Sequence, residues 1–153
     1  MDGDKPAERI HNLLQAGRTA TADWLADDQP VTAIAPILAA MANSTGGTLL
    51  IGIDADDIKN ADTPPTGSSD IAQKVAPAIT GVASDVKAID RLLQAALSLR
   101  PALIIPLPRV IDINGTKIIE TQIPTGMPHV YALDGRYLQR TDAQNAPMGP
   151  LDL

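Results

Sequence analysis

The sequence predicts an α+β fold, with helices packed on one side of a mixed or antiparallel sheet. Apolar residues recur at helical spacing through much of the first two-thirds of the chain. The last third instead holds short β-branched runs separated by two hairpin signals, Asn114-Gly115 and Asp134-Gly135. The length of 153 residues fits one domain, and we therefore expect residues 1–153 to form a single domain.

The N-terminal part predicts two helices. Asp4 can cap a first helix that carries an apolar stripe through Ile10 and Leu14 and ends at Gly17. A second helix follows the loop at residues 27–30, with Thr32 as the expected cap. Because proline removes a backbone donor, Pro36 is expected to confine regular helical hydrogen bonding to the residues after it.

Residues 37–54 join this second helix to a strand. The spacing of apolar residues is helical up to residue 42, whereas residues 48–53 form a short apolar run with β-branched members. Gly46 and Gly47 permit positive φ, so the chain can end the helix at Asn43 and turn at once. Phosphate loops run in the opposite order, from strand to helix, so we interpret both glycines as structural.

The middle of the chain predicts a loop and two further helices. Residues 59–69 are rich in Pro, Thr, Asp, Gly and Ser, which is typical of an exposed loop. Ser68 or Ser69 can cap a helix that extends to Ile79. Ser84 can cap an amphipathic helix that Pro101 stops.

The last third predicts strands and a tail. Residues 103–105 and 110–113 are apolar and β-branched, and residues 117–123 return antiparallel across the turn at Asn114-Gly115. Residues 130–133 and 136–140 flank Asp134-Gly135 as a second hairpin. Residues 141–153 are expected to form a flexible tail.

Two stretches of the chain resemble a known family. Residues 40–54 read Ala-Met-Ala-Asn-Ser-Thr-Gly-Gly-Thr-Leu-Leu-Ile-Gly-Ile-Asp, and Gly135-Arg-Tyr-Leu-Gln-Arg140 follows near the C-terminus. They resemble the Schlafen-type AlbA domain, whose signature is Ala-Asn-Thr, then Gly-Gly-x-Leu-x-Ile-Gly-Val-Asp and, later, Gly-x-Tyr-x-x-Arg. The resemblance covers residues 17–147. It implies a DNA-binding or RNA-binding module that acts in transcriptional or defence-related regulation.

The resemblance also implies an acidic site, which this chain has in degraded form. In the Schlafen branch, an acidic pair and the aspartate after the central strand hold a divalent metal that cleaves RNA. Asp23 and Asp54 match two of these positions, but Arg18 replaces the first acidic residue and Leu25 replaces a lysine. Since a guanidinium repels a metal ion, we expect no catalysis, no metal and no cofactor. A metal-dependent endoribonuclease is the least favoured alternative.

The composition opposes a large nucleic-acid surface. The net charge is −6, from 12 Lys and Arg against 18 Asp and Glu, and Trp24, Tyr131 and Tyr137 are the only aromatic residues. Nucleic-acid-binding proteins usually carry a basic excess, and those that hold single strands use aromatic platforms. A local cationic cluster can still bind phosphates on an acidic protein.

Arg136 and Arg140 are the leading candidates for such a cluster, because residues four apart on a strand lie on one face. The candidate neighbours of this pair are also cationic: Arg18, Lys117 and Arg109. An equally favoured interpretation is that Arg140 forms an ion pair with Asp23 or Asp54, where the family holds a metal.

A second hypothesis is an assembly module that forms homo-oligomers or docks on a partner protein. The acidic charge, the degraded acidic site and the scarcity of aromatic residues favour it. Neither a signal peptide nor an apolar run long enough to span a membrane is visible, so we expect a cytoplasmic protein with no membrane partner.

Overall fold

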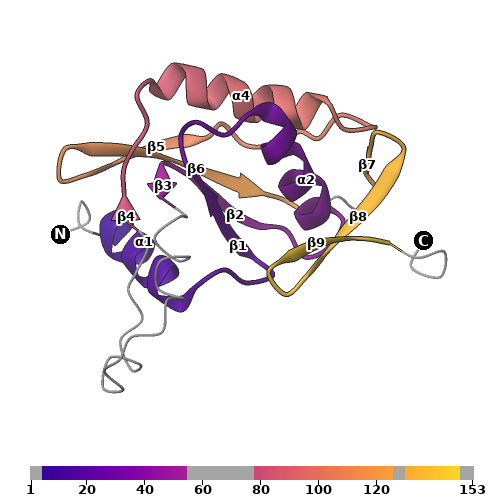
Figure 1. Cartoon of the computed structure of the whole chain (residues 1–153), viewed down its shortest axis with the longest axis horizontal. Helices are drawn as coiled ribbons and strands as arrows, with labels where there is room; N and C mark the ends of the chain where they lie inside the picture. The colour runs from indigo at the N-terminus through magenta and orange to yellow at the C-terminus, as the bar shows by residue number, and fades with distance from the viewer. Residues whose placement is uncertain (1–4, 55–77, 126–129, 149–153) are drawn as a thin grey trace, which may run out of the picture.

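The computed structural model describes residues 5–54, 78–125 and 130–148 (Figure 1). Its helices are α1 (Lys5–Ala16), α2 (Val31–Ala42) and α4 (Asp85–Leu97). Its strands are β1 (Ala22–Leu25), β2 (Gly47–Ile51), β3 (Ile53–Asp54), β4 (Ala78–Ile79), β5 (Arg109–Ile113), β6 (Thr116–Ile123), β7 (Ala132–Leu133), β8 (Arg136–Thr141) and β9 (Gln144–Pro147). No helix within these segments has the length and apolar character needed to cross a bilayer.

The central sheet is mixed, which confirms the predicted α+β class. Its strand order is β1-β2-β6-β5, with β1 parallel to β2 and the other neighbours antiparallel. Two smaller sheets complete the described strands: β3 pairs with β4, and β8 lies between β7 and β9.

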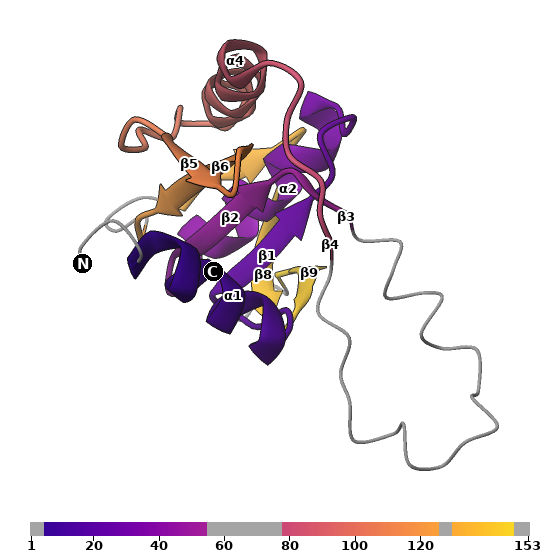
Figure 2. The same cartoon turned by 90° about the vertical axis from the view of Figure 1, so that its left-hand side faces the viewer.

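Helices cover both faces of the central sheet, whereas the sequence predicted helices on one face only. Leu49 and Ile51 pack with α2 and α4, whereas Leu50, which points the opposite way, packs with Ile10 and Leu14 of α1. Figure 2 shows α4 and α1 on opposite sides of the sheet. The extra layer arises because Leu49, Leu50 and Ile51 are apolar and buried at successive positions, so both faces of β2 need cover.

Helix α2 begins earlier than predicted and continues through Pro36. Pro30 occupies the N-cap without a side-chain cap, and Thr32 lies inside the helix, so both the predicted cap and the predicted restriction by Pro36 are wrong. A proline inside a helix costs about 3 kcal/mol. Eight of the twelve residues of α2 are buried, and we attribute the persistence of the helix to that burial.

Two predictions of local structure fail where a partner outside the predicted element decides. Ile79 was expected in a helix but belongs to β4, opposite Ile53 of β3. The rest of that helix and the 59–69 loop lie outside the described residues. Residues 103–105 form no strand: the Leu103 N–H donates to the Ala96 carbonyl at 3.0 Å, which ties this segment to the end of α4.

The local signals at helix α4 and at both hairpins are confirmed. Ser84 Oγ accepts from the Lys87 N–H at 3.3 Å, as a cap does. The Asn114-Gly115 and Asp134-Gly135 turns have positive φ at both residues, which matches the right-handed twist of the flanking strands.

The tail expected from residue 141 is partly a strand. Residues Gln144–Pro147 form β9 and pair with β8 across a turn that includes Asp142 at φ 53°. Aspartate tolerates this conformation better than most residues, but Asp142 has no following glycine to mark a hairpin in the sequence.

Candidate nucleic-acid interface

Asp23 lies at the centre of a cluster of charged residues on β1. Its Oδ1 accepts from Arg18 Nε at 2.6 Å and from the Trp24 N–H at 2.7 Å. Its Oδ2 lies 3.0 Å from an Arg140 terminal nitrogen. Both carboxylate oxygens therefore have a cationic partner, which is the ion-pair alternative that the sequence left open for Arg140.

Arg140 is a buried structural residue. Its side chain has no exposed surface. Its Nε and one terminal nitrogen donate to the Thr19 carbonyl at 3.2 and 2.9 Å, and that terminal nitrogen also reaches the Ala22 carbonyl at 3.2 Å. The other terminal nitrogen donates to Asn145 Oδ1 at 2.8 Å. The predicted role of Arg140 in binding phosphate is thus wrong for this geometry, because every guanidinium nitrogen is engaged inside the fold.

Arg18 occupies the other side of the same carboxylate. Its guanidinium lies 4.8 Å from the centre of the Trp24 ring, and its NH2 group donates to the Trp24 carbonyl at 3.2 Å. Its side chain is 27% exposed. Arg18 therefore shields Asp23 from solvent at the position where the family resemblance implies a first metal ligand.

Asp23 and Asp54, the two carboxylates that match the family's acidic site, lie on different strands. Asp23 pairs with Leu49 near the start of β2, whereas Asp54 lies on β3, beyond the bend at Gly52. Within the described residues, no group of three His, Cys, Asp or Glu side chains could hold a metal ion.

The joint between α2 and β2 holds the C-terminal strands in place. The Asn43 amide donates to the Tyr131 and Leu138 carbonyls at 2.9 and 2.8 Å, and its oxygen accepts from the Tyr131 N–H at 2.7 Å. Ser44 Oγ accepts from the Arg140 N–H at 2.8 Å. Sequence reasoning assigned Asn43 only to the helix end, because no local pattern reveals partners 88 and 95 residues away.

Gly46 and Gly47 are structural, as predicted. A Cβ at Gly46 would lie 2.5 Å from the Ile123 carbonyl oxygen, and one at Gly47 would lie 2.8 Å from the Thr21 carbonyl oxygen. The Gly46 N–H donates to the Met41 carbonyl at 2.7 Å. The turn thus passes too close to β6 and to the start of β1 for any side chain.

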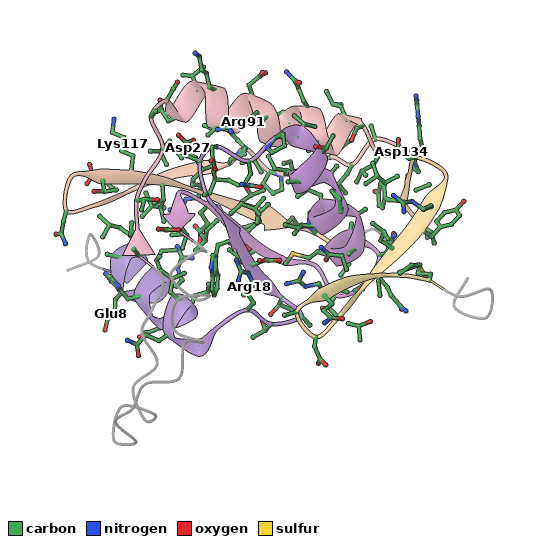
Figure 3. All side chains as sticks on the ribbon, viewed as in Figure 1. Glu8, Arg18, Asp27, Arg91, Lys117 and Asp134 are labelled. Carbon is green, nitrogen blue, oxygen red and sulfur yellow. The ribbon has the colours of Figure 1, made fainter. Side chains whose placement is uncertain are left out.

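The predicted cationic residues do not gather on one face. Arg18 and Arg140 meet at Asp23, whereas Arg136 and Lys117 are exposed elsewhere. Figure 3 shows Lys117 and Asp134, which lies two residues before Arg136, on opposite sides of the molecule.

The structure places further cations at or near the surface, beside those of the predicted set. Arg9 and Arg91 are paired, with Glu120 and Asp27 respectively, and the hydrogen bond to Glu120 raises the pKa of Arg9 above its ordinary value. Five exposed cations have no ion-pair partner among the residues that the structure describes: Lys87, Arg100, Arg109, Lys117 and Arg136. Sequence reasoning assigned no binding role to Arg100, which the fold brings beside β7.

Comparison with known proteins identifies the family. The model of the Schlafen, AlbA_2 family matches residues 20–149. The chain belongs to this family. No curated protein matches the chain in sequence.

Two solved structures share the fold of this AlbA_2 domain. One is the N-terminal domain of a protein from Nitrosomonas europaea described as related to the ATP-dependent DNA helicase RecG (TM-score 0.60, 17% identity, 91% of this chain and 88% of that chain). The other is the DIP2311 protein from Corynebacterium diphtheriae (TM-score 0.58, 15% identity, 95% of this chain). The present chain spans 26% of the DIP2311 chain.

Proposed function

We propose that this AlbA_2 domain is a nucleic-acid-binding module without catalytic activity, which acts in transcriptional or defence-related regulation. Its membership of the family and its similarity to a domain of a RecG-related protein support the nucleic-acid part. The non-catalytic part rests on one observation: both oxygens of Asp23 are engaged by Arg18 and Arg140.

The binding contacts come from a few exposed arginines on an acidic molecule. Arg136 lies at the turn between β7 and β8, and the backbone of Arg100 pairs with that of Ala132 in β7. Both are exposed, so they can reach phosphates without breaking an ion pair. Lys117 lies on the β5–β6 hairpin, on the opposite side of the molecule from Asp134 in that turn (Figure 3). It is therefore not expected to contact the same short stretch of nucleic acid.

Fluorescence anisotropy tests this function with labelled duplex DNA, single-stranded DNA and structured RNA, at low and near-physiological salt. We expect binding that weakens as salt rises and that the double substitution Arg100→Ala/Arg136→Ala weakens further. Lys117→Ala removes one exposed charge from the opposite side and serves as the matched control. Absence of binding to every probe at low salt would refute the proposal.

A cleavage assay tests the absence of catalysis. The same RNA, incubated with the protein and Mn²⁺, is expected to stay intact on a denaturing gel. Cleavage that depends on Mn²⁺ and disappears in Asp54→Ala would instead establish the nuclease alternative.

An assembly module is a second candidate, which an exposed apolar segment favours. Ile104 and Leu107 are 84% and 76% exposed, immediately before β5. Strand β5 is an outer strand of the central sheet and pairs only with β6 among the described strands. Exposed apolar side chains beside an open strand edge are typical of an interface.

Light scattering over a range of protein concentrations tests assembly. If the segment is an interface, Ile104→Asp/Leu107→Asp should shift the wild-type oligomer to a monomer at high salt. Val86→Asp changes an equally exposed apolar side chain on α4 and should leave the oligomer intact. A wild-type monomer at all concentrations would exclude homo-oligomerisation.

A further inference from the structure

Tyr137 is the exposed aromatic residue of this chain. Of its three aromatic residues, Trp24 is fully buried and Tyr131 is 7% exposed, whereas Tyr137 is 38% exposed. An exposed tyrosine ring on a strand offers a flat apolar surface with a polar tip, which is the chemistry that stacks on a nucleobase.

The register of β8 directs Tyr137 away from the core. Leu138 and Arg140 are buried, and Leu138 packs in the same core cluster as α2, so this side of β8 faces inward. Tyr137 and Gln139 alternate with them and belong to the outer face. In Figure 1 the β7–β8–β9 sheet lies at the side of the molecule, with α2 on its inner side.

The neighbours of Tyr137 on this outer face leave its ring accessible. Ala132 of β7 lies directly opposite Tyr137, and Ala146 of β9 lies opposite Gln139. Both are too small to cover an aromatic ring. Met148, which follows Pro147 in the register, borders Tyr137 on its other side, and Tyr137 is 38% exposed with Met148 in place. The Met148 N–H donates to the Tyr137 carbonyl at 2.8 Å, so the backbone that carries the ring is fixed on both sides.

Arg100 adds a cation to the same face. Its backbone exchanges two hydrogen bonds of 2.9 Å with Ala132, so the side chains of Arg100, Ala132 and Tyr137 form one row across three adjacent segments. Successive antiparallel pairs are spaced about 5.5 and 4.5 Å apart, which places the Arg100 and Tyr137 Cα atoms about 10 Å from each other. An arginine side chain at that spacing can contact the phosphate of a nucleotide whose base stacks on the ring.

We infer that the outer face of the β7–β8–β9 sheet binds single-stranded nucleic acid, with Tyr137 stacking on a base and Arg100 contacting the adjacent phosphate. This inference rests on the proposed function and assigns its substrate class. A duplex keeps its bases stacked on one another, so it cannot use an isolated ring in this way. The exposed carboxylates of Asp134 and Asp142, at the two turns of β8, disfavour phosphate at the tips of those turns.

Anisotropy with a labelled oligothymidine strand, compared with a duplex, tests this assignment. Tyr137→Leu removes the ring but keeps an apolar side chain, and it should weaken single-strand binding about five-fold or more while duplex binding is unchanged. Tyr137→Phe keeps the ring and should bind like the wild type. Arg100→Ala should also weaken single-strand binding, and thermal unfolding checks that each variant is folded.

The outcomes separate this inference from the proposed function. If the wild type binds nucleic acid but Tyr137→Leu binds the single strand equally well, the stacking assignment is wrong and the proposed function stands. A preference for the duplex would also overturn the assignment. If the wild type binds no probe, both fail.

Discussion

At the scale of single residues, the Asp23 cluster joins segments that are far apart in the sequence. One carboxylate lies between two guanidinium groups, so the cluster has an excess positive charge. The carbonyl oxygens of Thr19 and Ala22 accept from Arg140 and offset that excess with their partial negative charge. Arg140 thereby joins β8 to the start of β1.

The substitution Arg140→Met should destabilise the domain strongly. It leaves Asp23 with Arg18 as its cationic partner but removes the buried hydrogen bonds of the guanidinium to the Thr19 and Ala22 carbonyls, and a hydrogen bond to a charged group contributes about 1.5–3 kcal/mol to the unfolding free energy. Urea denaturation followed by circular dichroism measures this change. The exposed Arg136→Ala is the matched control and should alter stability by less than about 0.5 kcal/mol. A loss below about 1 kcal/mol for Arg140→Met would show that the cluster does not hold these strands together.

The sequence predicted part of this cluster. The pairing of Arg140 with Asp23 or Asp54 was one of two interpretations, because these residues match positions of the family's motif. The sequence did not predict that Arg18 reaches Asp23 and stacks on Trp24, since spacing along a chain fixes no side-chain distances. Arg100 carried no binding signal in the sequence, because the role proposed for it depends on its backbone pairing with Ala132, which only the fold creates.

At the scale of elements, predictions held where the cause is local. The cap at Ser84 and the turns at Asn114 and Asp134 follow from the chemistry of two to four adjacent residues. Predictions failed where a partner outside the predicted element decides. Ala78 and Ile79 pair with β3 in place of the predicted helix end, and Leu103 is bound to the end of α4 in place of the predicted strand.

Gly46→Ala should damage the fold much more than Gly115→Ala. Both glycines have positive φ, which costs any other L-residue about 1–2 kcal/mol. A Cβ at Gly46 also meets backbone of β6 at 2.5 Å, whereas a Cβ at Gly115 meets nothing within 4 Å. We therefore expect Gly46→Ala to lower the unfolding free energy by at least about 2 kcal/mol more than Gly115→Ala.

Paired urea titrations of the two glycine variants measure that difference. Similar losses of unfolding free energy in both variants would mean that the joint between α2 and β2 can move away from β6. Backbone conformation alone would then explain why position 46 is a glycine.

At the scale of the whole molecule, most charge is committed to the fold or opposes an anionic partner. The chain carries a net charge of −6, and four described arginines are held in ion pairs with Asp or Glu: Arg9, Arg18, Arg91 and Arg140. Five exposed cations have no ion-pair partner among the described residues, and they are spread from α4 to the β5–β6 hairpin. The proposed nucleic-acid contact is therefore small and depends on the few charges near β7.

The salt dependence of binding should reveal this small contact. Each phosphate neutralised on a single strand adds about −0.7 to the slope of log K against log salt. Two arginines, Arg100 and Arg136, therefore predict a slope of about −1.4, far shallower than that of a basic protein with many phosphate contacts. Each Arg→Ala change should flatten the slope by about 0.7, whereas Lys117→Ala should leave it unchanged.

Anisotropy titrations at several salt concentrations, repeated for the wild type and these three single variants, give the four slopes directly. A slope steeper than about −4, or one that Lys117→Ala flattens as much as Arg100→Ala does, would mean that the nucleic acid wraps the scattered cations. In that case Arg100 and Arg136, beside β7 and β8, would not form the interface. A slope near zero would instead mean that stacking dominates and that the arginines contact no phosphate.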